Sequence, residues 1–281
     1  MTEFLDIAGG RIAYEVAGHG PLIVLAHGLG DHRQAFRAVT PELVRAGFRV
    51  AAVDMRGHGE SSLGAWKSIS RTDVAGDLTA LVRHLGGPAV IVGHSLAGGS
   101  ATIAAAKAPE LVSGIVEIGP FTRKVEYSLG GLLRNRGYRR ATFRLGGLMV
   151  LRSLNSWMGY LDVAYPQKPA DYTAYMSALR AKLEEPGRKA ELLKTLKTSP
   201  ADAAAQLPHI SCPALVIMGS EDPDFADPRA EADAIVAAMP AGAGTVAMID
   251  GSGHYPHAQN AGQVAALITT FVRQRVPGKA A

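Results

Sequence analysis

The sequence is poor in cysteine, in net charge and in recognisable cofactor motifs. Its one cysteine, Cys212, excludes an internal disulfide and a paired-cysteine metal or redox site. A net charge of +4 gives no reason to expect a nucleic-acid partner. The sequence also lacks a phosphate-binding loop, a metal-ligand cluster and a nucleotide fingerprint. We therefore predict no cofactor and no metal.

The sequence has little that resembles a membrane or targeting segment. The stretch 86–106 has no charged residue and is long enough to suggest a membrane span. It contains His94, Ser95 and several glycines, which favour a buried strand, a turn and a buried helix instead. Glu3 and Asp6 stand where a secretory signal carries basic residues. We predict no membrane span and a cytoplasmic location.

What the sequence does contain is apolar residues, 47% of 281, which suffice for one large core. Continuous apolar runs, typical of buried parallel strands, occur at 22–26, 50–53, 89–92, 115–118, 215–218 and 246–249. A glycine pair separates two earlier runs, 4–7 and 12–16, as in a hairpin. Between the runs lie stripes of helical spacing, such as Val74, Leu78, Leu81, Val82 and Leu85. This alternation predicts an α/β fold with a mostly parallel, doubly wound sheet and a ligand site at the strands' carboxyl ends.

The alternation of strands and helices stops after Ile118. From 122 to 205 apolar residues recur at helical spacing without a strand run. We predict one core, residues 1–121 and 206–281, interrupted by a helical cap (lid) at 122–205. Residues 122–144 hold seven basic residues against one acid, Glu126. We interpret this basic stretch as a solvated face; the alternative is attraction of an anionic substrate or surface.

The clearest chemical signal is a strand that enters a turn of small residues and then an alanine-rich helix, at 90–99. Such a turn raises the hydroxyl of Ser95 above the sheet edge, with a helix N-terminus behind it to favour developing negative charge. A serine is a weak nucleophile at neutral pH and needs a base that an acid orients. The alternative is a serine that only caps a helix.

Polar residues follow the other predicted strands. Candidate acids are Glu221, Asp222 and Asp224 after the run at 215–218, and Glu117 within the run at 115–118. Two histidines, His254 and His257, follow the last run. The segment 54–61, Asp-Met-Arg-Gly-His-Gly-Glu-Ser, has the glycine spacing of a turn, and we assign it a packing role.

Together these motifs resemble the α/β-hydrolase superfamily, in its capped, esterase-like form with a serine nucleophile. The segment 90–99 is similar to its nucleophile elbow, Gly-x-Ser-x-Gly, with Ala97 in place of the last glycine. The segments 22–30, 54–61, 219–222 and 251–256 are similar to its other strand-end motifs. The resemblance spans about 1–121 and 206 to the C-terminus, and it implies the α/β-hydrolase fold with an inserted helical cap.

The resemblance also implies roles for individual residues. Ser95 would be the nucleophile, His254 the base and Asp222 the orienting acid, with Asp224 its main rival and Glu221 and Glu117 more remote ones. The backbone N–H groups of Leu29 and Leu96 would hold the oxyanion. His27 is expected to be structural, and His257 to lie at the surface or at a helix start.

The function predicted on this basis is a serine hydrolase that cleaves a small-molecule carboxylic ester or lactone through an acyl-enzyme. By the same resemblance, Ser95 argues against dehalogenase and epoxide hydrolase chemistry, which use an aspartate. The same triad could serve C–C hydrolysis, acyl transfer, perhydrolysis or a tailoring reaction. An alternative of another class is a ligand-sensing signalling protein. The cap is expected to line the pocket with apolar side chains, including Trp157, Tyr160, Tyr172 and Tyr175, so we expect a largely apolar substrate.

Overall fold

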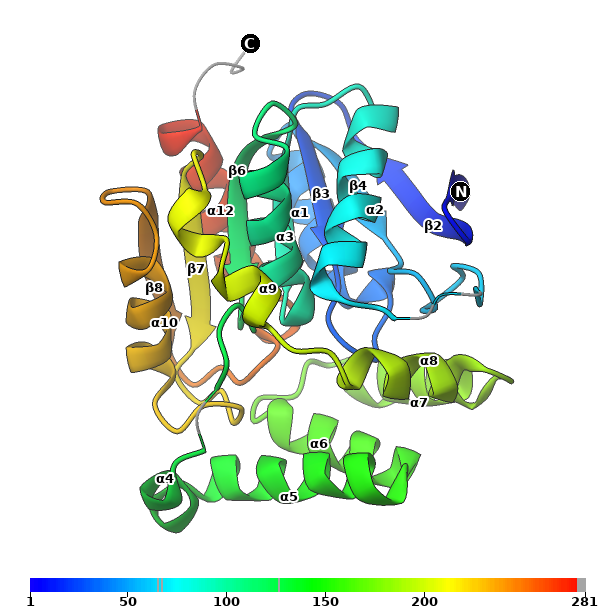
Figure 1. Cartoon of the computed structure of the whole chain (residues 1–281), viewed down its shortest axis with the longest axis vertical. Helices are drawn as coiled ribbons and strands as arrows, with labels where there is room; N and C mark the ends of the chain where they lie inside the picture. The colour runs from blue at the N-terminus through cyan, green and yellow to red at the C-terminus, as the bar shows by residue number, and fades with distance from the viewer. Residues whose placement is uncertain (65, 67, 126, 277–281) are drawn as a thin grey trace.

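One sheet of eight strands organises the chain (Figure 1). The structure is a computed structural model, and it describes residues 1–64, 66, 68–125 and 127–276. The strands are β1 (Glu3–Ile7), β2 (Gly10–Ala17), β3 (Leu22–Ala26), β4 (Arg49–Val53), β5 (Ala89–His94), β6 (Val112–Ile118), β7 (Ala214–Gly219) and β8 (Gly244–Ile249). Each predicted apolar run falls within one of these strands. The stretch 86–106 forms β5, a turn and a helix, and no helix among the described residues could cross a membrane.

The order of the strands is β1-β2-β4-β3-β5-β6-β7-β8. Strands β1 and β2 form an antiparallel hairpin, and β2 pairs antiparallel with β4. The six strands β4, β3, β5, β6, β7 and β8 pair in parallel. In this register Ala26 lies opposite both Val53 and Gly93. The carboxyl ends of the parallel strands therefore meet at one edge of the sheet, and this confirms the predicted fold class.

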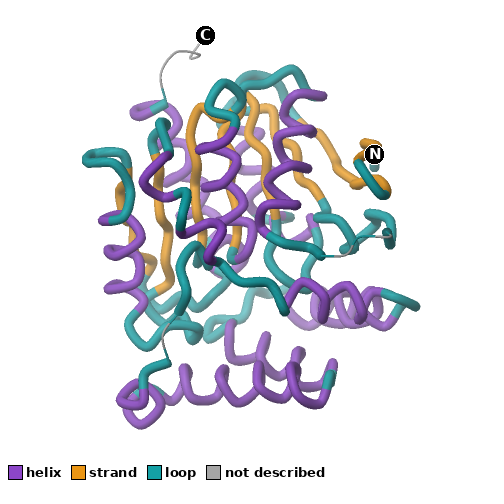
Figure 2. Tube along the Cα trace, viewed as in Figure 1, coloured by secondary structure: helices purple, strands orange, loops and turns teal. Residues whose placement is uncertain are grey.

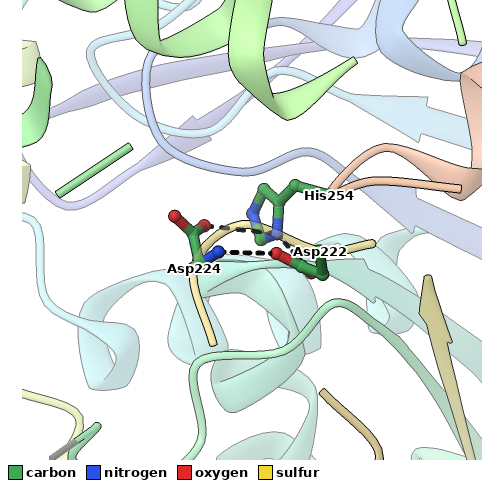
Figure 3. Close-up of side chains that lie close together, drawn as sticks. All are labelled: Asp222, Asp224 and His254. Carbon is green, nitrogen blue, oxygen red and sulfur yellow. Dashed lines mark hydrogen bonds and ion pairs between the residues drawn. The ribbon is translucent and has the colours of Figure 1, made fainter. Parts of the chain in front are cut away.

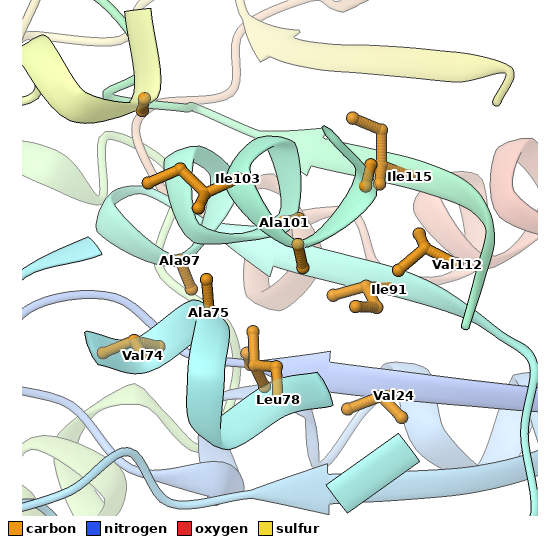
Figure 4. Packing of buried hydrophobic residues seen from close by; sticks show 14 of the residues in the cluster. Val24, Val74, Ala75, Leu78, Ile91, Ala97, Ala101, Ile103, Val112 and Ile115 are labelled. Atoms are coloured by element: carbon orange, nitrogen blue, oxygen red, sulfur yellow. The ribbon is translucent and has the colours of Figure 1, made fainter. Parts of the chain in front are cut away.

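Helices cover both faces of the sheet, because its central strands are apolar on both sides. On one face α2 (Arg71–His84), α3 (Leu96–Lys107) and α10 (Pro228–Ala237) pack on side chains such as Val24 and Ile91 (Figure 4). On the other face α1 (Val39–Arg45) and α12 (Ala261–Arg275) pack on Ile23 and Leu25. Short helical turns occur at Arg33–Phe36, Leu207–His209 and in α11 (Pro256–Gln259).

Among the described residues, the interval between β6 and β7, where the sequence predicts the cap, holds the short turn Leu207–His209 and six α-helices. They are α4 (Leu129–Arg134), α5 (Arg136–Leu151), α6 (Leu154–Ala164), α7 (Tyr172–Glu184), α8 (Arg188–Leu196) and α9 (Ala201–Ala204). Figure 2 shows α4 to α8 gathered beyond the carboxyl ends of the strands, while α9 packs on α2 and α3. Helices α5 to α8 share an apolar cluster of their own, which also includes Tyr255 and Ala258 from the core. These helices and the core thus meet beside the strand ends.

The core predicts a clear difference between two substitutions to alanine. Ile91 in β5 is fully buried, whereas Leu133 in α4 is 81% exposed. Ile91→Ala should lower the free energy of unfolding in urea by about 2 to 5 kcal/mol, because it leaves a cavity in a packed core. The control Leu133→Ala should change it by less than about 0.5 kcal/mol. Equal losses in the two variants would contradict this assignment of the core.

Candidate active site

Ser95 stands between β5 and α3 in a backbone conformation that few residues other than glycine adopt. Its φ is 54° and its ψ is −117°. Such strain persists only where the surroundings impose it. Here the N–H of Ser95 donates to the Ile118 carbonyl at the end of β6 (2.9 Å), and its own carbonyl accepts from Gly98 (3.0 Å) and Phe121 (3.1 Å). These three bonds fix the turn that raises the serine above the sheet.

The turn also requires small neighbours. A Cβ on Gly93 would lie 2.2 Å from the Ala97 carbonyl oxygen, and one on Gly98 would lie 2.7 Å from Cβ of Pro120. Ala97, which replaces the last glycine of the family pattern, is fully buried and packs beside Ala75 of α2 (Figure 4). Its methyl group is therefore accommodated in the core and does not disturb the turn.

The loop after β3 lies directly against the elbow. A Cβ on Gly28 would come within 2.8 Å of both Ser95 Cβ and His94 Nδ1, so the backbone here passes beside the serine. Leu29 follows Gly28, and Leu96 is the first residue of α3, where backbone N–H groups have no acceptor within the helix. Both leucines line the same pocket as Ser95.

His254 and Asp222 form a buried pair beside that pocket (Figure 3). His254 Nδ1 lies 2.9 Å from Oδ2 of Asp222, which follows the end of β7. Two further bonds hold the loop of His254. The N–H of His254 donates to the Ala164 carbonyl in α6 at 3.0 Å, and the carbonyl of His254 lies 2.9 Å from His94 Nε2. The imidazole is thus oriented through Nδ1, and His254 also lines the pocket of Ser95.

Asp224 contributes a second carboxylate to the same imidazole. Its Oδ2 lies 3.3 Å from His254 Nδ1 and accepts a hydrogen bond from the Tyr160 hydroxyl of α6 at 2.6 Å. Its backbone N–H donates to Asp222 Oδ1 at 3.0 Å (Figure 3). Asp224 is therefore not the helix cap of α10, a role that Asp227 fills. The two sequence candidates, Asp222 and Asp224, both reach the histidine.

These contacts shift the affinity of the cluster for protons. Burial by itself lowers the pKa of His254, but the charges of Asp222 and Asp224 and the hydrogen bond to Asp222 outweigh it, so the pKa is raised above the usual 6.5. Burial raises the pKa of Asp224, and the charge of His254 opposes this rise. The cluster therefore favours a positive imidazole held between carboxylates.

The remaining candidates lie elsewhere. Glu117 is buried beneath the elbow, where its carboxylate contacts the Thr102 hydroxyl and burial raises its pKa to about 8. Glu221 is exposed and lines a different cavity. His27 is structural as predicted, because its Nε2 accepts from the Met55 N–H at 3.0 Å. For His257 the expected helix start is confirmed, because it is the second residue of α11, whereas the expected surface position is wrong: its side chain is buried and stacks on Phe36.

A pocket of about 280 Å³ opens at Ser95 between the core and the cap. Of the four predicted cap aromatics, Trp157 and Tyr160 line it, whereas Tyr175 instead bonds to Asp31 and Tyr172 packs on Tyr165. The pocket wall also includes two cations: Arg71, which the sequence did not select, and Lys124, which belongs to the predicted basic stretch 122–144. The lining therefore combines apolar side chains with two positive charges.

The basic stretch 122–144 divides between two surroundings. Lys124 lines the Ser95 pocket, whereas Arg134, Arg136 and Arg140 line a separate, larger cavity between helices α4 to α6 and the loop after β7. Most of the predicted basic stretch thus lies away from Ser95.

One group of ligating side chains within the described part of the chain is compact enough for a metal ion. Its members are Asp222, Asp224 and His254, whose ligand atoms lie within 4.8 Å of one another. Because His254 Nδ1 already faces both carboxylates as their hydrogen-bond partner, the geometry also suits an acid–base cluster without an ion.

A strained serine elbow, a histidine paired with an acid after β7 and a helical cap are the features of serine-type α/β hydrolases. The family model described as "Alpha/beta hydrolase family" matches residues 23–267. The chain belongs to this family, as the sequence predicted.

Two curated relatives illustrate the range within the family. A pimeloyl-acyl-carrier-protein methyl ester esterase of Chromobacterium violaceum is 30% identical over 220 residues, covering 74% of this chain and 78% of the relative. A 2-(acetamidomethylene)succinate hydrolase of Mesorhizobium japonicum is 34% identical over 176 residues, covering 61% of this chain and 58% of the relative. This hydrolase and three mycobacterial relatives are matched over only 40% to 58% of their own length. Among solved structures, a membrane phospholipase A superposes with a TM-score of 0.80 at 20% identity, covering 97% of this chain and 86% of that one, which shows the shared fold.

The two carboxylates predict distinct effects on the protonation of His254. Asp222→Asn should lower the pKa of His254 most, because it removes the nearer charge, and Asp224→Asn should lower it by a smaller amount. Asp227→Asn, at the exposed N-cap position of α10, serves as the control and should leave the pKa of His254 unchanged. The measurement is an NMR titration of the imidazole. A His254 pKa below 6.5 in the unmodified protein would contradict the proposed electrostatics.

Proposed function

We propose that the protein is a serine hydrolase that cleaves a small-molecule carboxylic ester or lactone through an acyl-enzyme. The observation that carries the proposal is the pairing of His254 with Asp222 in the pocket that Ser95 lines from a strained elbow. Pairing with an acid fixes the imidazole with its other nitrogen, Nε2, available to a nucleophile. We also propose residues 122–205 as the cap that encloses this pocket.

In the first half of the reaction Ser95 Oγ attacks the ester carbonyl and transfers its proton to His254 Nε2. Asp222 holds the resulting imidazolium by its hydrogen bond to Nδ1. The negative charge on the carbonyl oxygen is stabilised by the backbone N–H groups of Leu29 and Leu96. When the tetrahedral intermediate collapses, the C–O bond breaks and the leaving alcohol takes the proton from His254.

The second half repeats these steps with water. His254 removes a proton from a water molecule, whose oxygen attacks the acyl carbon bound to Ser95. The intermediate collapses, Ser95 Oγ recovers the proton from His254, and a carboxylic acid is released. A lactone follows the same course, except that the acid and the alcohol leave as one molecule.

The curated relatives support hydrolysis without fixing the bond. One is named as a methyl ester esterase and the other as a hydrolase of an acetamidomethylene succinate. The alternatives with the same triad are C–C hydrolysis, acyl transfer, perhydrolysis and a tailoring reaction, which product analysis with alcohol or peroxide competitors would distinguish. For a ligand-sensing protein, one would expect little or no multiple turnover and a partner that binds only with ligand.

The proposal predicts the behaviour of a serine variant. Ser95→Ala should reduce the turnover of a short activated ester by about 10⁶-fold, because the triad acts as a unit. Ser100→Ala, on the next turn of α3, is the matched control and should retain turnover. A serine-reactive phosphonate should attach to Ser95, as mass spectrometry would detect. Ordinary turnover by Ser95→Ala would refute the proposal.

The raised pKa of His254 predicts the pH dependence of activity. Only the neutral imidazole accepts a proton, so kcat/KM for an uncharged ester should fall as the pH drops through the His254 pKa, with a midpoint above pH 6.5. Asp224→Asn removes a charge that favours the imidazolium and should move that midpoint to lower pH. Asp227→Asn should not move it. A midpoint that does not respond to Asp224→Asn would assign the profile to another group.

A further inference from the structure

Arg71 is a buried arginine in the wall of the Ser95 pocket. It is the first residue of α2, and only 5% of its surface is exposed. Its Nε donates to the Phe121 carbonyl at 2.8 Å. Its Nη1 is buried and has no hydrogen-bond partner among the residues that the structure describes. The inner nitrogen is thus anchored, and the outer part of the guanidinium is left unsatisfied.

The other buried arginines of the core are paired differently. Arg33 forms an ion pair with Asp54, and Arg56 forms one with Asp77 at 2.5 Å. Within the described part of the chain, Arg71 has no such ion pair with a carboxylate. Burial lowers the pKa of Arg71 to about 10, against the opposing charge of Asp202, so the side chain stays protonated near neutral pH. An unpaired buried charge costs free energy that a ligand of opposite charge would recover.

The fold provides a slot for this side chain. A Cβ on Gly99 of α3 would lie 2.8 Å from Arg71 Cδ and 3.1 Å from its Nε. The arginine therefore lies against the first turns of α3, four residues after Ser95. Any side chain at position 99 would have to displace it.

Arg71 is also linked to the elbow through Phe121. The carbonyl of Phe121 accepts from Arg71 Nε, and its N–H donates to the carbonyl of Ser95. This chain of two hydrogen bonds fixes the guanidinium relative to the serine. Lys124, three residues further along, brings a second positive charge to the same pocket. The carboxylate in the described lining, Asp224, is engaged by His254 and Tyr160 through its Oδ2, whereas its Oδ1 is buried without a partner among the described residues.

We propose that Arg71, assisted by Lys124, binds a free carboxylate of the substrate while the ester carbonyl of that substrate lies at Ser95. A planar guanidinium matches a carboxylate with two parallel hydrogen bonds, and its Nε anchor leaves the outer nitrogens for this purpose. The substrate class is then an ester or lactone that carries a second, ionised carboxyl group. This inference rests on the proposed function and narrows its substrate.

The test compares two esters that differ in one charge. They are the 4-nitrophenyl half-ester of adipic acid and the corresponding methyl 4-nitrophenyl diester, with nitrophenol release corrected for spontaneous hydrolysis. The unmodified protein should prefer the anionic ester in kcat/KM. In Arg71→Met the ratio of anionic to neutral kcat/KM should fall by about 10- to 100-fold, the range expected for a charge-assisted hydrogen bond.

Further variants separate recognition from structure. Lys124→Gln should lower the same ratio by a smaller factor, and Arg71→Lys should retain part of it because the charge remains. Arg123→Gln is the matched control, since Arg123 pairs with Glu231 and does not line the pocket; it should leave the ratio unchanged. An unaltered ratio in Arg71→Met, or no preference for the anionic ester in the unmodified protein, would overturn the proposal.

A binding measurement keeps this proposal distinct from the catalytic one. Calorimetry on Ser95→Ala should detect adipate, and adding Arg71→Met should weaken its binding by about tenfold or more. Binding of adipate that is indifferent to Arg71 would overturn the carboxylate site even if ester hydrolysis is established. Adipate binding that depends on Arg71 would support the site even if Ser95→Ala retained turnover. Stronger binding of inorganic phosphate than of adipate would assign the site to a different anion and reject the carboxylate.

Discussion

The site depends on the hydrogen bonds that hold the backbone of Ser95 in its strained turn. Its N–H reaches the end of β6, and its carbonyl accepts from the segment that follows β6. Both bonds exist because β5 and β6 are parallel neighbours in register, with His94 opposite Ile118. Strand pairing stabilises the whole sheet, so it also supplies the free energy that keeps one residue in an unfavourable conformation.

Around this turn the chain buries several polar groups, and those of the acid–base cluster partly compensate one another. Asp222, Asp224, His254 and Tyr160 share hydrogen bonds and opposite charges, which offsets the cost of removing them from water. Several buried polar atoms lack such a partner among the described residues; in the lining of the Ser95 pocket they are Arg71 Nη1, Trp157 Nε1 and Asp224 Oδ1, and Arg71 is the one of these that carries a positive charge. A buried group that the fold leaves unsatisfied identifies where a ligand has most to contribute.

Helix α6, in the segment proposed as the cap, contacts the acid–base cluster as well as the pocket. Helix α6 accepts the N–H of His254 through Ala164 and donates to Asp224 through Tyr160. Gly30, in the loop after β3, packs closely against Trp157 of α6 and Leu192 of α8. A change in the packing of α6 would therefore affect the protonation of His254 in addition to the shape of the pocket. The shape of the pocket and the surroundings of His254 thus depend on the same helix.

The sequence alone determined the fold class and the strand at 22–26, and it selected Ser95, Asp222 and His254 as candidate site residues, because these follow from local apolar runs and short motifs. It left Asp222 and Asp224 as rivals, and it did not select Arg71 or the bond from Tyr160 to Asp224. Tyr160 and Asp224 are 64 residues apart, and Arg71 is 50 residues from Phe121. Only the tertiary structure decided that His257 is buried, that both carboxylates reach one imidazole and that an arginine faces the serine pocket. The physical reason is that hydrogen bonding and burial depend on distances in space, whereas the motifs of the sequence record only neighbours along the chain.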